Sequence, residues 1–137
     1  MEKPSISQLG ADERHDLCQL DPALLKKHRH WNAAGKWSGQ FTVAVWLRFP
    51  ESLMENVQLW LNYRDGERRK SLLIDKCYAN RQTLSLLNGK VNLEVSGKVV
   101  EMSLFLQGLS PTAAWILDEY RFEPHLAAAA VNFKRAN

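Results

Sequence analysis

The chain of 137 residues is long enough for one domain with a hydrophobic core, and its 45% hydrophobic and 24% charged residues are typical of globular proteins. Its net charge of +3 is small, so it permits anionic partners without requiring one. No apolar stretch is long enough to cross a bilayer, which excludes a membrane-spanning helix and predicts no membrane partner.

The N-terminal part predicts an arm and one helix. Residues 1–16 are polar and mixed, which is typical of a tail or an irregular arm. Asp21 is predicted to cap a short helix over residues 23–30, with Pro22 at its first position. Without an apolar signal region near the N-terminus, a complete chain is expected to be cytoplasmic, whereas an excised domain carries no such expectation.

Strict alternation of apolar and polar residues then predicts two long strands, at 37–49 and 57–64. In both strands the odd-numbered positions are predicted to face the core. The even-numbered positions face outward and are mostly polar, apart from Trp46 in the first strand and Trp60 in the second. Asp65-Gly66 predicts a tight hairpin turn into a return strand, because such a turn needs residues that adopt positive φ.

Residues 83–106 predict a three-stranded antiparallel meander. Asn88-Gly89 between alternating apolar residues is a strong hairpin signal, and Ser96-Gly97 is a second turn. Two-residue turns pair Leu86 with Val91 and place the following residues on one dry face: Leu84, Leu86, Val91, Leu93, Val100 and Met102. The opposite face is polar, so we expect one buried and one solvated side.

A closing strand is predicted at 114–123, and the alanine-rich tail after it forms a short helix or a disordered end. With about seven or eight short strands separated by turns, the fold class is all-β. We predict an antiparallel β-sandwich of jelly-roll type with a short N-terminal helix. Residues 1–137 form a single domain, with its core at about 37–124 and arms or tails at 1–16 and 125–137.

The C-terminal half resembles a known family. LSLLNGKVNLEVSGKVVEMSLFLQGLSPTAAWILDEYRFEP is similar to the closing strands of galactose-binding-like jelly rolls, the fold of many carbohydrate-binding modules. Those chains tend to end with an apolar-apolar-Asp-acidic-aromatic strand, and residues 116–122 have this form. Over roughly residues 37–124 the resemblance implies the fold and a sugar-binding role. By position it also implies that Asp118 helps to hold a structural calcium ion, and no other cofactor is expected.

The outward tryptophans are the leading candidates for ligand binding. A sugar ring stacks its apolar face on an indole, while its hydroxyls need fixed amides and guanidinium groups. The predicted ligand-binding residues are therefore Trp46, Trp60, Arg48, Gln58, Asn62 and Arg64. If the two strands share a sheet, these residues form one patch. If the chain crosses between sheets at 50–56, they line outer faces without meeting.

Two alternatives to sugar binding stay open. In the first, the N-terminal arm or a second subunit covers Trp46 and Trp60, because large apolar residues on the far face of a strand usually lie under a cover or in an interface. This favours a protein-interaction module or a homodimer as the alternative function. In the second, basic residues near Asp65-Gly66 join those at 26–29 as an anion-binding surface, but no nucleic-acid motif accompanies them and nucleic acid is not an expected partner.

No residues in the sequence predict an enzyme. Asp118 and Glu119 are adjacent on a strand, so they point to opposite faces and cannot act as an acid/base pair. Cys18 and Cys77 are isolated and are expected to be free thiols without an activating base, and the histidines lack zinc-site spacing. The predicted function is therefore non-catalytic binding of a carbohydrate or similar polar ligand, with a protein partner as the alternative.

Overall fold

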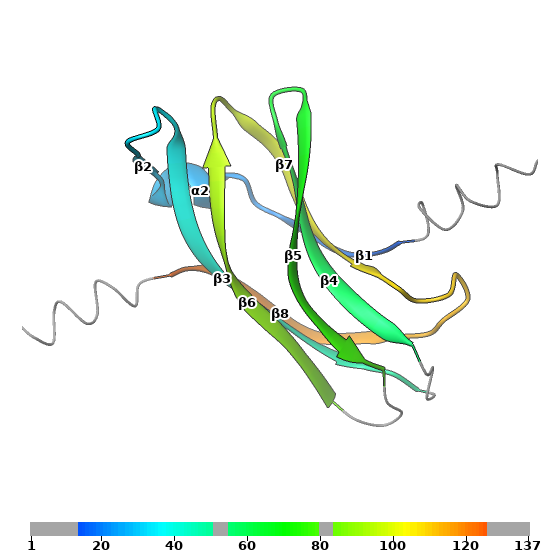
Figure 1. The fold of residues 1–137 in the computed structure, drawn as a ribbon. Coiled ribbons are helices and arrows are strands. Elements are labelled where there is room, and N and C mark those ends of the chain that lie inside the picture. The colour runs from blue at the N-terminus through cyan, green and yellow to red at the C-terminus, as the bar shows by residue number, and fades with distance from the viewer. Residues whose placement is uncertain (1–13, 51–54, 80–83, 126–137) are drawn as a thin grey trace, which may run out of the picture.

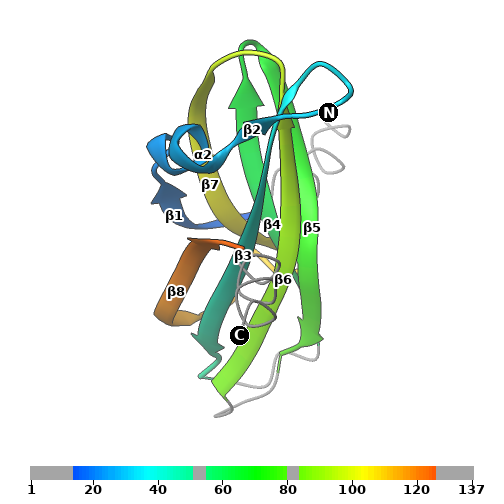
Figure 2. The same cartoon turned by 90° about the vertical axis from the view of Figure 1, so that its left-hand side faces the viewer.

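The computed structural model describes residues 14–50, 55–79 and 84–125, which form a sandwich of two antiparallel sheets (Figures 1 and 2). The predicted arm before residue 14, the predicted tail after residue 125 and most of the predicted loops after Pro50 and Ala79 lie outside the described residues. The elements are β1 (His15–Leu20), α2 (Ala23–His28), β2 (His30–Trp31), β3 (Trp37–Arg48), β4 (Asn56–Asp65), β5 (Arg68–Tyr78), β6 (Leu84–Val95), β7 (Val99–Gln107) and β8 (Ile116–Pro124).

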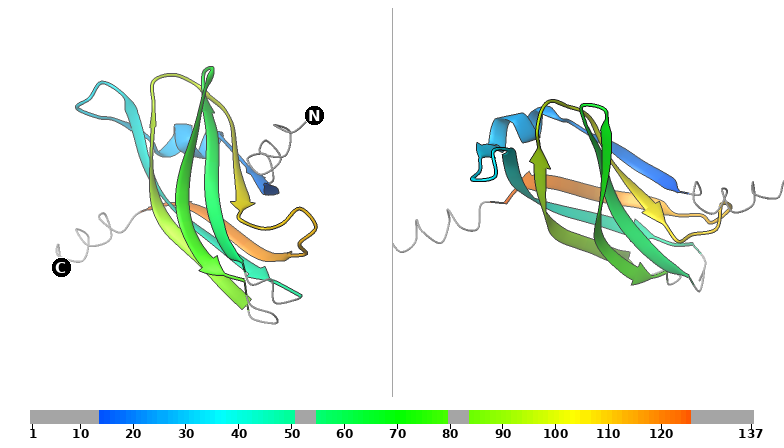
Figure 3. Two further views of the ribbon diagram at one scale, coloured as in Figure 1. Left: turned by 45° about the vertical axis from the view of Figure 1, so that its right-hand side comes forward. Right: turned by 45° about the horizontal axis from the view of Figure 1, so that its top comes forward.

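Strands that follow one another in the sequence do not always lie in the same sheet. Sheet A has the order β1-β7-β4-β5, and sheet B has the order β2-β3-β6, with β8 also paired to β3. Both views in Figure 3 show α2 beside the connection from β6 to β7, at one end of the sandwich. The all-β jelly-roll class and the short N-terminal helix are thus confirmed. The one helix in the described part of the chain is far too short to span a membrane.

The core forms where the predicted alternation is strongest. Odd-numbered residues of β3 and β4 point between the sheets, because successive side chains of a strand alternate between its two faces. The fully buried residues of these strands and of the segment after β3 are Phe41, Val43, Val45, Leu47, Phe49, Val57, Leu59 and Leu61. The predicted inward faces of both strands are therefore correct.

The predicted hairpin between β4 and β5 is confirmed, with its turn one residue later than predicted. Asp65 is still in β4 and pairs with Arg68, so Gly66 and Glu67 form the turn. Gly66 has a φ of 65°, the left-handed conformation that favours glycine.

The predicted hairpin at Asn88-Gly89 is wrong. β6 is one continuous strand through these residues and pairs along its length with β3, so that Leu86 lies opposite Trp46 and not Val91. Without a turn the alternation does not reverse, and Leu87 is buried while Leu86 is exposed. Gly89 serves close packing: a Cβ atom there would lie 2.8 Å from the carbonyl oxygen of Ile74 on β5, where the two sheets approach each other.

The rest of the predicted meander is also wrong, since β6 and β7 belong to different sheets. The turn at Ser96-Gly97 carries the chain across the sandwich, and β7 pairs with β4 and β1. Asp65 holds this crossing, because its carboxylate accepts the backbone N–H groups of Ser96 at 2.8 Å and of Gly97 at 3.0 Å. Of the predicted dry face, Leu84 and Val100 are exposed, whereas Met102 is buried.

The terminal segments differ in part from prediction. The helix ends at His28, and the Asp21 carboxylate accepts the N–H of Ala23 at 3.0 Å. Residues 15–20, predicted to lie in the arm or before the core, form β1 and pair with β7. In β8, Phe122 is buried, but a register shift opposite Trp46 and Leu47 of β3 interrupts the alternation. The prediction that Asp118 and Glu119 point to opposite faces is therefore wrong, since both carboxylates pair with arginines beside Trp46.

Candidate functional site

Trp46 and Trp60 lie on the outer faces of different sheets. Trp46 is in the centre of sheet B on β3, and Trp60 is in sheet A on β4. Both indoles are half-buried. The chain crosses between the sheets after β3, so the two residues do not form one patch. The six predicted ligand-binding residues accordingly divide between the sheets: Trp46 and Arg48 lie on β3, and Gln58, Trp60, Asn62 and Arg64 lie on β4.

The outer side of sheet B around Trp46 is called the Trp46 face. Trp46 lies between Leu86 of β6 and Glu119 of β8, and the next outward row places Arg48 between Leu84 and Ile116. Leu84 and Leu86 are each 46% exposed and Ile116 is 49% exposed. The face therefore presents an indole among aliphatic side chains.

Two guanidinium groups are held in place on the Trp46 face. Arg48 Nε lies 2.8 Å from Asp118 Oδ2, and Arg121 Nε lies 2.9 Å from Glu119 Oε2. The Arg121 guanidinium also lies over the Trp46 ring, 5.5 Å from its centroid. Such exposed pairs add little stability, but each fixes the direction of a hydrogen-bonding fork. Within the described ranges, the Trp46 indole N–H has no hydrogen-bond partner.

Polar side chains extend the face away from Trp46 along β3. Thr42 Oγ1 lies 3.3 Å from His125 Nδ1, and Asn88 and Lys90 of β6 are exposed in the rows beside Ala44 and Thr42. The Trp46 face thus joins an aromatic centre to a strip of hydrogen-bonding groups.

The outer side of sheet A around Trp60, the Trp60 face, is built differently. The Trp60 ring stacks on Phe105 at 6.3 Å with an interplanar angle of 7°, and its N–H donates to Gln58 Oε1 at 3.0 Å. Arg14 lies over the Phe105 ring, 4.5 Å from its centroid, and Phe105 is buried. Trp60 therefore has its N–H satisfied and part of its ring covered by the protein.

The other predicted residues on the Trp60 face are also engaged within the sheet. Asn62 is buried, and its side-chain oxygen accepts the Ser71 hydroxyl at 3.4 Å. Arg64 Nε lies 3.9 Å from a Glu101 oxygen that also pairs with Arg69, and this buried Nε donates no hydrogen bond among the described residues. Asn62 thus ties β4 to β5 by a hydrogen bond, whereas Arg64 is held to β7 by charge alone.

The Asp118 carboxylate, implied as a calcium ligand, is paired with Arg48. No group of three or more His, Cys, Asp or Glu that would suit a metal ion occurs in the described part of the chain. His15 accepts the indole N–H of Trp115 at 2.9 Å. The cysteines are free, as predicted. Burial raises the pKa of the Cys18 thiol to about 11, and burial, together with the Asp75 charge, raises the pKa of Cys77.

Sequence reasoning misses the neighbours of Trp46 that come from other strands. The predicted turn at Asn88-Gly89 would have placed Leu84 and Leu86 in the core. In the structure β6 continues through these residues without a turn, so both side chains point outward. No local signal identifies Glu119 or Arg121, because only the pairing of β8 with β3 brings them beside Trp46.

Comparison with solved structures supports the fold. No model of a known protein family matches the chain, and no curated protein is significantly similar to it. The solved structures that are similar to the chain include the CBM22-1–GH10 modules of the Clostridium thermocellum endo-1,4-beta-D-xylanase 10B complexed with xylohexaose (TM-score 0.53, 11% identity, 82% of this chain and 26% of that one). They also include the CBM22-1 xylan-binding domain of Paenibacillus barcinonensis Xyn10C (TM-score 0.51, 14% identity, 71% of this chain and 69% of that one).

A third structure, the CBM22-2 xylan-binding domain of the same Xyn10C, has a TM-score of 0.49 at 9% identity, with 64% of this chain and 63% of that one covered. The chain thus spans less than two thirds of two of these solved structures, by 63% and 26% of their lengths. At these identities the likeness shows the fold alone. The predicted resemblance to the β-sandwich of carbohydrate-binding modules is confirmed.

Proposed function

We propose that this protein is a non-catalytic carbohydrate-binding domain that holds a glycan on its Trp46 face. The observation that carries the proposal is a half-buried indole with an unpartnered N–H among the described residues, flanked by two guanidinium groups of fixed direction. The indole offers an apolar platform to a sugar ring, and the guanidinium groups and its own N–H offer hydrogen bonds to hydroxyls.

The names of two structural neighbours agree with this proposal, since one is a xylan-binding domain and the other was solved with xylohexaose. The fold is compatible with many functions, so this agreement supports the class of ligand only by analogy. The surface chemistry of the Trp46 face is the independent support.

The Trp46 face fits this role better than the Trp60 face. Trp60 has already given its N–H to Gln58, and its ring stacks on Phe105. A glycan on that face would compete with interactions that stabilise sheet A. On the Trp46 face, Arg48 and Arg121 each use Nε to bind a carboxylate, which leaves other N–H groups of each guanidinium for a ligand.

Calorimetric titration with a panel of soluble hexasaccharides, xylohexaose among them, tests the proposal. We expect at least one to bind, and Trp46→Ala to weaken that binding by roughly 30-fold, the loss typical of a central aromatic contact. The matched control is Trp31→Ala, because Trp31 is 59% exposed and lies on β2, away from the Trp46 face. Circular dichroism of each variant checks the fold.

Two results would contradict the proposal. If no glycan of the panel bound, the proposed carbohydrate-binding function would be refuted. Binding that Trp60→Ala abolishes while Trp46→Ala leaves it unchanged would move the site to the other sheet.

A protein interface is the second candidate function, favoured by the three exposed aliphatic residues around Trp46. Large exposed apolar side chains beside Trp and Arg are typical of binding hot spots. Sedimentation velocity over a range of concentrations distinguishes the two functions. A stable dimer that dissociates in Leu86→Lys would favour the interface, whereas a monomer at every concentration would argue against self-association.

A further inference from the structure

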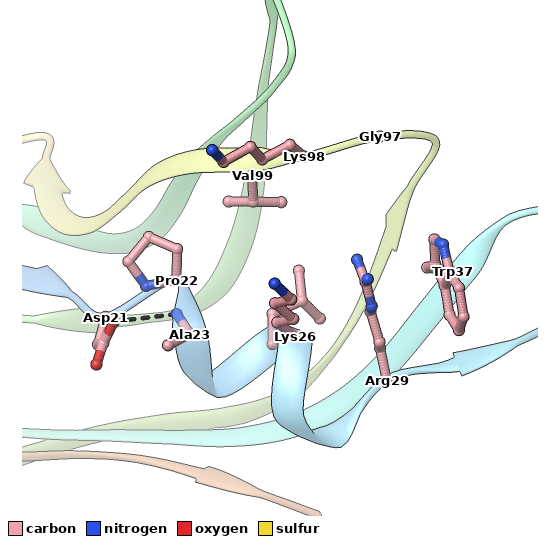
Figure 4. A pocket seen from close by; sticks show the side chains of 10 residues that line it. Asp21, Pro22, Ala23, Lys26, Arg29, Trp37, Gly97, Lys98 and Val99 are labelled. Atoms are coloured by element: carbon pink, nitrogen blue, oxygen red, sulfur yellow. Dashed lines mark hydrogen bonds between the residues drawn. The ribbon is translucent and has the colours of Figure 1, made fainter.

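A cavity at one end of the sandwich is independent of the Trp46 face. It has a volume of about 630 Å³ and lies between α2 and the connection from β6 to β7. Figure 4 shows Lys26 on α2 and Arg29 just after it, with Lys98 and Val99 on the opposite side and Trp37 at one end. This size is in the range of small-molecule sites, which runs from about 300 to 1,000 Å³.

The cavity is lined by an excess of positive charge. Lys26, Arg29 and Lys98 face a single acidic residue, Asp21, and the Asp21 carboxylate accepts the backbone N–H of Ala23. None of the three cations has an ion-pair partner among the residues that the structure describes. Like charges gathered without a counter-ion repel one another, and a bound anion relieves that repulsion. The net lining charge of +2 suits a dianion.

Arg29 is held in a direction suited to an oxyanion. Its guanidinium lies over the Trp37 ring, 4.3 Å from the centroid, and the Trp31 ring packs edge-on against Trp37 at 5.1 Å. The aromatic pair restrains the planar fork, so less entropy is lost when the guanidinium donates two parallel hydrogen bonds to a phosphate or carboxylate.

The remaining walls are apolar. Leu25 is 1% exposed at the base of the cavity, and Pro22, Ala23 and Val99 complete the lining. These side chains offer no hydrogen bonds, so they suit the carbon framework of a ligand rather than a hydrated inorganic ion. A charged cluster and an apolar wall in one cavity indicate an organic anion.

We propose that this cavity binds a small organic phosphate, with Arg29, Lys26 and Lys98 on the phosphate group and Pro22 and Val99 against the carbon framework. A phosphate monoester carries a charge of about −1.5 to −2 at neutral pH, which matches the lining. The proposal does not depend on glycan binding, because the cavity and the Trp46 face share no residue.

An adjoining cavity of about 460 Å³ is a weaker candidate, although Lys36, Arg68 and Lys70 line it. Lys70 Nζ already donates to the Glu94 carbonyl at 3.2 Å and lies 3.8 Å from Asp65 Oδ2. Asp65 in turn holds the β6–β7 connection. Part of the charge there is thus used by the fold itself.

Titration calorimetry with three ligands that share a pyranose ring tests the proposal, at about 50 mM salt so that screening is modest. Glucose 6-phosphate is expected to bind, glucuronate, with one charge, to bind more weakly, and glucose not to bind. Arg29→Gln and Lys98→Gln should each weaken glucose 6-phosphate binding about 10-fold or more, as for a lost hydrogen bond to a charged group. Arg29→Lys, which keeps the charge but loses the fork, should fall between Arg29→Gln and the unmodified protein.

The matched control is Lys76→Gln, which removes an exposed lysine near the far end of β5. Thermal unfolding of each variant checks that the fold is retained. Absence of binding by glucose 6-phosphate, equal binding of glucuronate, or an equal loss in Lys76→Gln would overturn the proposal. Tight binding of a heparin fragment without binding of glucose 6-phosphate would also overturn it, because that result describes a diffuse basic surface.

Discussion

Substitution of Gly89 tests the strand register that builds the Trp46 face. A Cβ atom at this position would lie 2.8 Å from the Ile74 carbonyl oxygen, about 0.6 Å closer than the 3.4 Å at which ordinary contact begins. The neighbour is backbone of β5, so relief requires the two sheets to separate. Overpacking of this kind costs about 1–3 kcal/mol. Replacing glycine by alanine also lowers the conformational entropy of the unfolded chain, which offsets about 0.4–1 kcal/mol of that cost. We expect Gly89→Ala to lower the free energy of unfolding by about 1–2 kcal/mol.

Gly66 provides the matched comparison. Its φ is 65° and nothing lies within 4 Å of a Cβ built there, so its constraint is conformational rather than steric. Asparagine tolerates the left-handed region better than alanine does. At position 66 we therefore expect Asn to be more stable than Ala, whereas at position 89 the larger Asn should be less stable than Ala.

Urea unfolding of the four variants, followed by circular dichroism, measures this crossed order. If Gly89→Asn were as stable as Gly89→Ala or more stable, position 89 would behave as a turn. The outward placement of Leu84 and Leu86 beside Trp46 would then be wrong.

The remaining predictions concern single side chains. Asp65→Asn should cost about 2–3 kcal/mol in urea unfolding, because one of two charge-assisted hydrogen bonds to backbone N–H groups of the β6–β7 connection is lost; a change below the error of the fit would refute this. Trp60→Ala should cost about 2–3 kcal/mol, since Phe105 loses its stacked partner, and it should leave glycan affinity unchanged. With the pKa of Cys18 at about 11, its alkylation at pH 8 should be about 100-fold slower than that of an ordinary thiol, should accelerate as the pH rises toward 11, and should become ordinary in denaturant; Cys77 should also be slowed. Fast native alkylation of either thiol would contradict the burial.

The parts of the fold that local chemistry determines could be predicted from the sequence. The alternation in β3 and β4 extends over long strands with one apolar face, so it reports burial directly. The turn after Asp65 has in Gly66 the residue that a left-handed turn position needs, and nothing lies close enough to this glycine to give it a packing role. In both cases the deciding residues lie within a short distance of the feature along the chain.

Where the deciding partner is distant in sequence, prediction from local pattern failed. Gly89 follows an asparagine and lies between apolar segments of the sequence, as a hairpin glycine does, but its role is set by its contact with Ile74 on another strand. β1 carries few apolar residues in regular alternation and becomes a strand because β7 offers it an edge. Pairing of this kind cannot be inferred from the period of one segment.

The candidate site shows the same division. The outward position of Trp46 followed from alternation, and so did that of Trp60. Whether they share a sheet depended on the path of the chain after β3, which no residue type reports. The topology separates them and gives Trp46 a set of neighbours from β6 and β8 that sequence reasoning places elsewhere.

The crossing after β6 connects the two proposed sites physically. Up to Val95 the strand lies beside β3 and supplies Leu84 and Leu86 to the Trp46 face. It then passes to the other sheet and brings Lys98 over α2, where the cationic cavity forms. Because the Asp65 carboxylate binds the crossing at Ser96 and Gly97, its substitution should disturb phosphate binding in the cavity more than glycan binding near the far end of β6. Equal loss at both sites in Asp65→Asn would mean that the sandwich responds as a whole, and the two surfaces would then not be independent.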